Sequence, residues 1–295
     1  MTARALARVL FAGASLLVLI VPFSIGSQDD DSKAIKAEVF IKQRPIKSAP
    51  SRARYRPAAK SNEPITSTPP NGMVTAEIGL TIWRYRTVAG RDRTKELIEE
   101  DDGEEWILER IAEGTPLIPG QKVRLSLESL SKVGFLYVID REEYADGTFG
   151  DPILIFPTQK SMDSNKVEPG RLVYIPSTSG RFRIKPSESA KTHVGESLTI
   201  IVSSKSLIDD SQLQPGAIKL QPKQFDQWLS KSKPRTAKFE MEGGEGQTMT
   251  RLEKIAANLH SPLLAQSDPV PQTIYQLVVK PEEPLLITLP LRFAR

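Results

Sequence analysis

The sequence contains no cysteine, and this absence excludes several classes of protein. A chain without cysteine has no disulfide, no thiolate nucleophile and no zinc–thiolate site, and it cannot be tethered to a membrane through a lipidated cysteine. A small secreted scaffold that depends on disulfide bridges is therefore excluded. Export without disulfides remains compatible with a bacterial cell envelope.

Histidine is nearly as scarce, and familiar catalytic motifs are missing. The two histidines, His193 and His260, lie far apart, and no Gly-x-Ser-x-Gly or His-Glu-x-x-His motif occurs. Residues 242–248 are rich in glycine but lack the Lys followed by Ser or Thr that a phosphate-binding loop needs. The net charge of +4 is too small to indicate nucleic-acid binding. We therefore expect a protein that is not an enzyme, with no cofactor, no resident metal and no nucleic-acid partner.

Residues 1–26 predict a signal peptide. Arg4 and Arg8 precede an apolar run at 9–21, and the small residues Ser24 and Gly26 follow at the spacing that a signal peptidase reads. The run has about 13 residues, fewer than the roughly 17 to 25 that a membrane-spanning helix needs. We expect cleavage after Gly26 and export to the periplasm, the cell envelope or the extracellular space. Retention of the run as a membrane anchor is the alternative.

Residues 27–72 predict a disordered, basic, proline-rich linker. Between residues 33 and 60 there are nine Lys or Arg and one acid, Glu38, and six prolines lie between residues 45 and 70. Such a segment buries too little apolar surface to offset the entropy cost of ordering it. We interpret it as a solvated spacer. The alternatives are contact of residues 33–60 with an anionic membrane surface or envelope polymer, and contact with the acidic run at 96–105 of the same molecule.

Residues 73–295 predict one mainly β domain, an antiparallel β-sandwich. The clearest pattern lies between residues 121 and 157, where 122–128 alternate apolar and polar side chains and 135–139 and 152–156 are short aromatic and β-branched runs. The short connections favour three adjacent strands of one antiparallel sheet. Further strands are expected at 78–86, 172–176, 181–185, 196–203, 273–279 and 285–293. Turn signals between the strands are typical of a sandwich.

Two short accessory helices are expected within this domain. Pro222 suits the first position of a helix, and Phe225, Trp228 and Leu229 form one apolar stripe. The string Thr-Arg-Leu-Glu at 250–253 is a capping box that predicts the start of the second helix.

Several strings in the domain together resemble the bacterial family known as domain of unknown function 4384. They are Val-Arg-Leu-Ser at 123–126, Gly-Phe-Leu-Tyr-Val-Ile-Asp-Arg at 134–141, Tyr-Ala-Asp-Gly-Thr at 144–148 and Leu-Ile-Phe-Pro-Thr at 154–158. The resemblance covers roughly residues 78–293. It implies an exported or envelope-associated β-rich module, which in other chains is joined to caspase-like peptidase or kinase domains, with no catalytic residues assigned.

The connection from Asp140 to Asp151 carries the residues that we expect to meet a partner. Tyr144 and Phe149 lie there among polar residues, and aromatic side chains in polar loops are frequent binding hot spots. The predicted binding site consists of Asp140, Tyr144, Asp146, Phe149 and Asp151. The function that this pattern favours is a non-enzymatic envelope module that binds a protein or an envelope polymer.

Three alternatives remain open for the same connection. The plainest is a hairpin loop whose two aromatic side chains fold back on the core. Another is a carboxylate-dependent envelope hydrolase or carbohydrate-active protein, because glycosidases work with paired Asp or Glu residues. A third is calcium binding, because clustered carboxylates suit hard cations.

Overall fold

The computed structural model describes the domain and a short segment that precedes it. The described residues are 36–44, 46, 72–92, 98–101, 103–130, 133–176, 180–185, 187, 189, 191–231, 234–256 and 263–294. The predicted signal peptide and most of the predicted linker lie outside these residues. Within them, no helix has the length and apolar character needed to cross a membrane.

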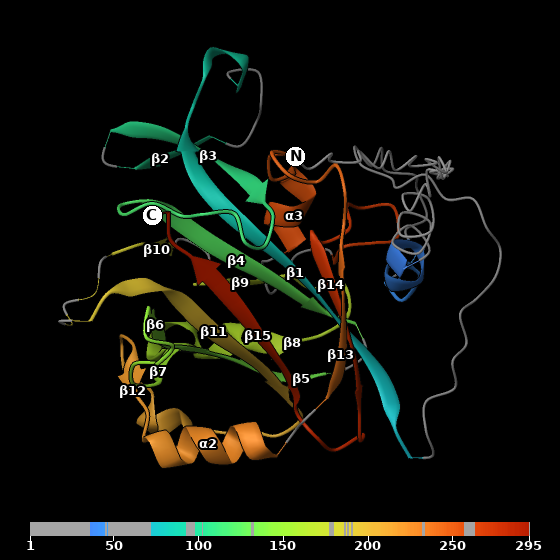
Figure 1. Ribbon diagram of the computed structural model, residues 1–295. Coiled ribbons are helices and arrows are strands. Elements are labelled where there is room, and N and C mark those ends of the chain that lie inside the picture. The colour runs from blue at the N-terminus through green and yellow to red at the C-terminus, as the bar shows by residue number, and fades with distance from the viewer. Residues whose placement is uncertain are drawn as a thin grey trace, which may run out of the picture.

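Two antiparallel β-sheets stack face to face, which confirms the predicted mainly β, sandwich-like fold (Figure 1). The first sheet has the order β10 (Phe182–Arg183), β4 (Lys122–Ser129), β1 (Val74–Thr87), β14 (Thr273–Val279) and β13 (Arg235–Glu240). In addition, β9 (Val173–Ile175) pairs with β4, β3 (Glu104–Ile111) pairs with β1, and β2 (Ile98–Asp101) pairs with β3. Strand β1 lies inside this sheet and is buried along most of its length.

The second sheet carries the 140–151 connection. Its order is β12 (Ile218–Lys219), β7 (Ile153–Phe156), β5 (Gly134–Asp140), β11 (His193–Ser203) and β15 (Leu285–Arg292), with β6 (Glu142–Tyr144) beside β11 and β8 (Lys166–Val167) beside β5. Short 3-10 helices lie at η1 (Gly90–Asp92), η2 (Gln159–Ser164) and η3 (Asp210–Gln212).

The prediction of three adjacent strands between residues 121 and 157 was wrong in one respect. Strands β5 and β7 pair as expected, but β4 belongs to the opposite sheet. The apolar side chains explain this arrangement. Leu125 and Leu127 of β4 share the central core with Leu136 and Val138 of β5, so the two strands pack against one another instead of pairing.

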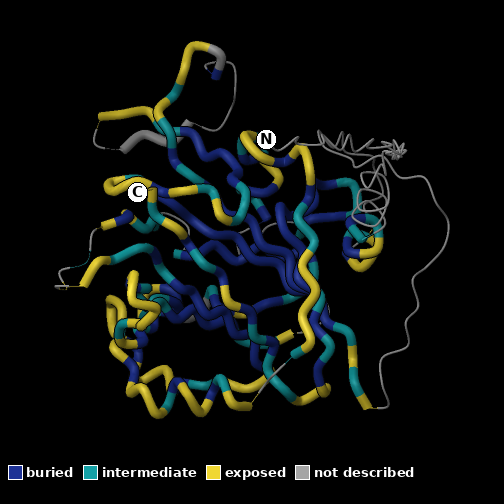
Figure 2. Tube along the Cα trace, viewed as in Figure 1, coloured by how far each residue is buried: buried dark blue, intermediate teal, exposed yellow. Residues whose placement is uncertain are grey.

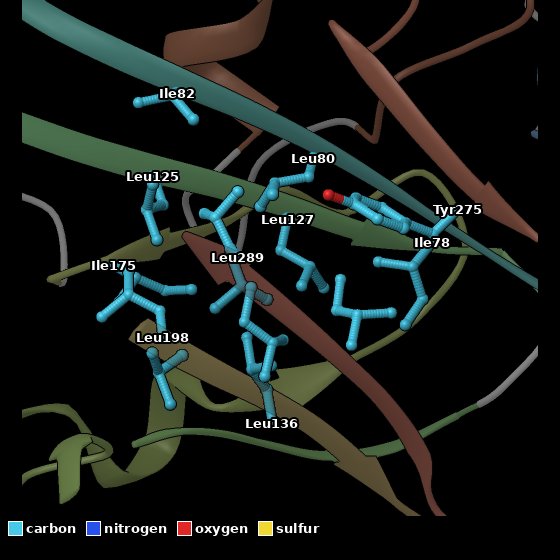
Figure 3. Close-up of a cluster of buried hydrophobic side chains, with 14 of the residues drawn as sticks. Ile78, Leu80, Ile82, Leu125, Leu127, Leu136, Ile175, Leu198, Tyr275 and Leu289 are labelled. Atoms are coloured by element: carbon cyan, nitrogen blue, oxygen red, sulfur yellow. The ribbon is translucent and has the colours of Figure 1, made fainter. Parts of the chain in front are cut away.

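The central core fills the space between the sheets (Figure 3). Leu80 and Leu127 from the first sheet meet Leu136 and Leu289 from the second, and Figure 2 shows buried residues along both sheets. Each such side chain stabilises the fold by roughly 1.5–3 kcal/mol on burial. The alternation of inward and outward side chains along each strand decides which residues enter this core.

Helices cover the outer faces of both sheets (Figure 1). Helix α2 (Pro222–Ser230) packs Phe225 and Trp228 against Ile139 and Ile201 of the second sheet. Helix α3 (Arg251–Ala256) lies on the first sheet, where Ala256 joins the cluster around Trp83. Both predicted helices are present. The capping box at α3 is also confirmed, because Glu253 N donates to Thr250 Oγ1 at 3.2 Å and Thr250 N donates to Glu253 Oε2 at 2.8 Å.

Residues 36–42 form a third helix, which packs on the first sheet. Ala37 and Phe40 are buried beside Ile274, and Arg44 just beyond the helix donates two hydrogen bonds to Glu128, at 2.6 and 2.9 Å. Lys36 forms a second ion pair, with Glu77. At these residues the structure differs from the predicted disordered linker. Two apolar side chains three positions apart and two largely buried ion pairs offset the cost of ordering this segment.

Candidate functional site

At one end of the sandwich, the inward-facing rows of β5 and β11 change from apolar to acidic. Val138 is followed two positions later by Asp140, and Leu198 is preceded two positions earlier by Glu196, so both acids face the space between the sheets. Strand β6 continues alongside β11 and places Glu142 opposite Glu196. Like charges directly opposite one another destabilise a sheet. We call Asp140, Glu142 and Glu196 the acid cluster.

A β-bulge at the start of β11 aligns His193 with Tyr144 and turns it toward the acid cluster. The side chain of His193 is only 6% exposed, and Phe293 packs against it edge-on with 4.7 Å between ring centroids. The backbone N–H of Ser187 donates to Nδ1 at 3.0 Å. Nε2 lies 3.3 Å from Glu196 Oε1 but makes no hydrogen bond with any described group.

Glu142 is the well-partnered member of the acid cluster. Its Oε2 accepts hydrogen bonds from the hydroxyl of Tyr144 at 2.5 Å and from Ser187 Oγ at 2.8 Å. Tyr144 is therefore buried at the base of the loop, where its hydroxyl fixes the position of a carboxylate.

Asp140 and Glu196 have perturbed acidities. Burial raises the pKa of Glu196 to about 9, and the negative charges of Asp140 and Glu142 add to this shift. Burial also raises the pKa of Asp140 to about 6, against the opposing effect of a hydrogen bond with Glu196. Because two adjacent carboxylates resist ionising together, the pair holds a proton near neutral pH. When both are ionised, Asp140 Oδ1 and Glu196 Oε2 are buried and have no hydrogen-bond partner in the described part of the chain.

The other predicted site residues lie on the outer surface of the loop. Asp146 accepts hydrogen bonds from the backbone N–H and Oγ1 of Thr148 and pairs with Lys191 at 3.0 Å. These hydrogen bonds lower the pKa of Asp146 to about 2. Asp151 pairs with Lys219 at 2.6 Å. Both aspartates therefore lie in surface ion pairs, away from the acid cluster.

Phe149 is 43% exposed, in contrast to the buried Tyr144. The guanidinium of Arg141 lies 4.6 Å from the centroid of the Phe149 ring, within the range of a cation–π contact. Arg141 is held in turn by its Nε, which donates to the carbonyl of Gly150 at 3.1 Å. Of the two aromatic side chains in the loop, one folds back on the protein and the other remains at the surface.

The structure thus separates the five predicted residues into an inner and an outer group. Asp140 belongs to the acid cluster and Tyr144 donates a hydrogen bond to it, whereas Asp146, Phe149 and Asp151 lie outside it. The predicted binding site did not include Glu196, Glu142 or His193. Glu196 carried a signal, because it continues the alternating row of Leu198. The bulge that brings in His193 carried only a weak signal, the glycine at position 195. Among the described side chains, no three His, Asp or Glu residues are grouped to hold a metal ion.

Comparisons with known proteins return no match to this chain, either among protein-family models, among curated proteins or among solved structures.

Proposed function

We propose that the chain is an exported, non-enzymatic binding module of the bacterial cell envelope, which recognises a protein or an envelope polymer. The proposed recognition surface is the 140–151 loop together with the acid cluster beneath it. The observation that carries the proposal is the exposed Phe149, which is fixed over Arg141 on a loop that is itself held in place.

Backbone hydrogen bonds hold the 140–151 loop in one conformation. Tyr144 N donates to the carbonyl of Thr148 at 3.0 Å, and Gly150 N donates to that of Glu142 at 2.9 Å. Gly147 occupies the tip with a φ of +78°, which favours glycine. A loop ordered before binding loses less entropy when it binds, so its exposed aromatic side chain can contribute more to affinity.

The place of the module in the cell is part of the same proposal. A predicted signal peptide, the lack of cysteine and the resemblance to domain of unknown function 4384 support an envelope location. Three of the basic residues between 33 and 60 already form ion pairs within the protein, so membrane contact through this segment would depend on the other basic residues. Lys36 pairs with Glu77 and Arg44 with Glu128 within the domain, and Lys42 pairs with Glu38.

Partner capture by loop variants tests this function. The full chain, Phe149→Ala and Val133→Ala are each crosslinked in native envelope, and the captured partners are compared. Val133 is a matched control because it is also an exposed apolar residue, directly before β5 and outside the loop. We expect Phe149→Ala to lose most of the capture with little change in melting temperature, and Val133→Ala to retain it. Equal capture by all three proteins would contradict the proposed surface.

A carboxylate-dependent hydrolase is the second candidate, because Asp140 and Glu196 share a proton. Two carboxylates that share one proton are an arrangement that hydrolases use for acid–base catalysis, as in the aspartic proteases. Turnover of an envelope polymer by the full chain, lost in Glu196→Gln and in Asp140→Asn while both variants stay folded, would support this candidate. A lack of turnover with any envelope polymer would reject it.

A further inference from the structure

We propose that the proton shared by Asp140 and Glu196 is a latch that holds the 140–151 loop in its binding conformation. While the two acids share a proton, the loop stays fixed on β11, and when both acids are ionised the loop is released. This inference rests on the proposed binding function, because the latch regulates the same loop. It also gives a role to the buried acids, which the exposed Phe149 leaves unexplained.

The two acids join different strands. Asp140 ends β5 and Glu196 belongs to β11, and their side chains share a hydrogen bond. Asp140 Oδ1 and Glu196 Oε2 are both buried, and neither accepts a hydrogen bond from any other group in the described part of the chain. Buried acceptors without a donor cost free energy, and one proton between these two oxygens satisfies both. The proton therefore ties β5 to β11.

The latch lies at the seam that holds the loop to the sheet. Strand β6 forms the first part of the 140–151 connection, and among the described strands it pairs only with β11. Just before β6, Arg141 N donates to the carbonyl of Ser197 at 3.2 Å, and Ser197 N donates to that of Arg141 at 2.8 Å. Asp140 and Glu196 directly precede these two residues. Repulsion between the acids therefore acts on the seam that fixes the loop.

The described groups around the latch leave a second negative charge unbalanced. Glu142, opposite Glu196, adds its own negative charge, and no basic side chain is among the groups that shift the pKa values of the two acids. His193 also faces the pair, with Nε2 3.3 Å from Glu196 Oε1, but an imidazole carries no charge at alkaline pH. The basic side chains nearest in sequence are engaged elsewhere: Arg141 with Gly150 and Phe149, Lys191 with Asp146, and Arg292 with Glu143.

The acidity of the pair sets the pH at which the latch opens. Burial raises the pKa of Asp140 to about 6 and that of Glu196 to about 9, so the pair loses its last proton as the pH rises through about 9. Below this pH the hydrogen bond is kept, and above it two adjacent negative charges repel one another. The population with a released loop should rise by up to about tenfold for each pH unit, the limit for loss of one proton.

The mobility of a spin label in the full chain tests the latch. Because the chain has no cysteine, Phe149→Cys and Val133→Cys each carry a nitroxide at a single position, the first in the loop and the second outside it. Electron paramagnetic resonance spectra between pH 7 and pH 10 measure the mobile fraction of each label.

Amide variants in the Phe149→Cys background keep the latch closed. Glu196→Gln and Asp140→Asn each replace an acid by a group that stays uncharged and can donate the hydrogen bond at every pH. Either variant alone is sufficient for the comparison. The matched control is Glu143→Gln, because Glu143 also lies on β6 but pairs with Arg292 at 2.6 Å.

The expected result is a label at position 149 that becomes more mobile as the pH rises above about 9, and a label at position 133 that does not change. Glu196→Gln and Asp140→Asn should abolish the rise, and Glu143→Gln should keep it. No rise at position 149, an equal rise in the amide variants, or the same rise at position 133 would each overturn the latch.

Partner capture at pH 7 and pH 10 separates the latch from the proposed function. The unchanged protein should capture less partner from native envelope at pH 10, whereas Glu196→Gln should capture as much as at pH 7. Equal losses in both proteins would overturn the latch. Loss of capture in Phe149→Ala at pH 7, without any change of label mobility with pH, would leave the proposed function in place and reject only the latch. A pH-dependent label with no effect of Phe149→Ala on capture would reject the proposed surface instead.

Discussion

The acids at the end of the sandwich core show how a single side chain acquires an unusual property from its position. Glu196 belongs to the row that supplies Leu198 and Ile200 to the core, so it is drawn out of water with them. Glu142 lies opposite and Asp140 on the adjacent strand. Desolvation and like charge act in the same direction, and both raise the pKa of Glu196.

A dependence of stability on pH follows at this residue. Burial raises the pKa of Glu196 from 4.5 to about 9, so between these values the folded protein binds more protons than the unfolded chain. The free energy of unfolding should therefore fall as the pH rises through this window, by at most about 1.4 kcal/mol per pH unit for one proton. Urea unfolding at several pH values measures it.

The matched variant for this measurement is Glu196→Gln, which imitates the protonated acid at every pH. Its free energy of unfolding should change less between pH 5 and 9 than that of the unchanged protein. A variant with the same slope as the unchanged protein would show that Glu196 is not the group responsible.

At the scale of elements, the segment 36–44 is held in place by residues that are distant in the sequence. Arg44 and Glu128 are both almost fully buried, and Arg44 Nη1 also donates to the carbonyls of Asp268 and Pro269 at 3.0 and 3.1 Å. Phe40 lies against β1 at Gly79, where a Cβ would come within 2.7 Å of its ring. The segment therefore fits a position on the first sheet that is shaped to receive it.

Arg44→Ala tests how strongly this segment is held. The substitution leaves Glu128 buried without its main partner, so we expect a loss of about 3–5 kcal/mol in the free energy of unfolding, measured with urea. The control is Lys42→Ala on the same helix, whose exposed pair with Glu38 should contribute less than about 0.5 kcal/mol. Similar small losses in both variants would mean that the segment detaches easily from the sheet.

The strands were predictable where apolar side chains alternate or cluster, and unpredictable elsewhere. Strands β1, β11 and β15 supply rows of apolar side chains to the core, and the sequence indicates all three. Strand β13, with the sequence Arg-Thr-Ala-Lys-Phe-Glu, has one large apolar residue and pairs only with β14 at an edge of the first sheet, so no periodic pattern marks it. Segment 36–44 was missed because its stability comes from Glu77 and Glu128, which lie in other elements.

At the scale of the whole molecule, the sandwich determines which predicted site residues meet. Turn spacing and strand composition were sufficient to predict the fold class. They were insufficient to assign β4 to the opposite sheet or to place Glu142 opposite Glu196, because sheet assignment and strand register are set by contacts between distant segments. The 140–151 connection does lie between β5 and β7, but it contains strand β6, which the sequence did not indicate. The burial of Tyr144 depends on the pairing of β6 with β11, whereas Phe149 lies outside β6 and remains exposed.

Site-specific photocrosslinking tests the central proposal most directly. The photoreactive residue p-benzoylphenylalanine replaces Phe149 in one variant of the full chain and Val133 in another, and both are irradiated in the envelope of living bacteria. The proposed function predicts a discrete adduct from position 149 that is absent from position 133. The same adducts from both positions, or none from position 149, would contradict a binding surface on the 140–151 loop.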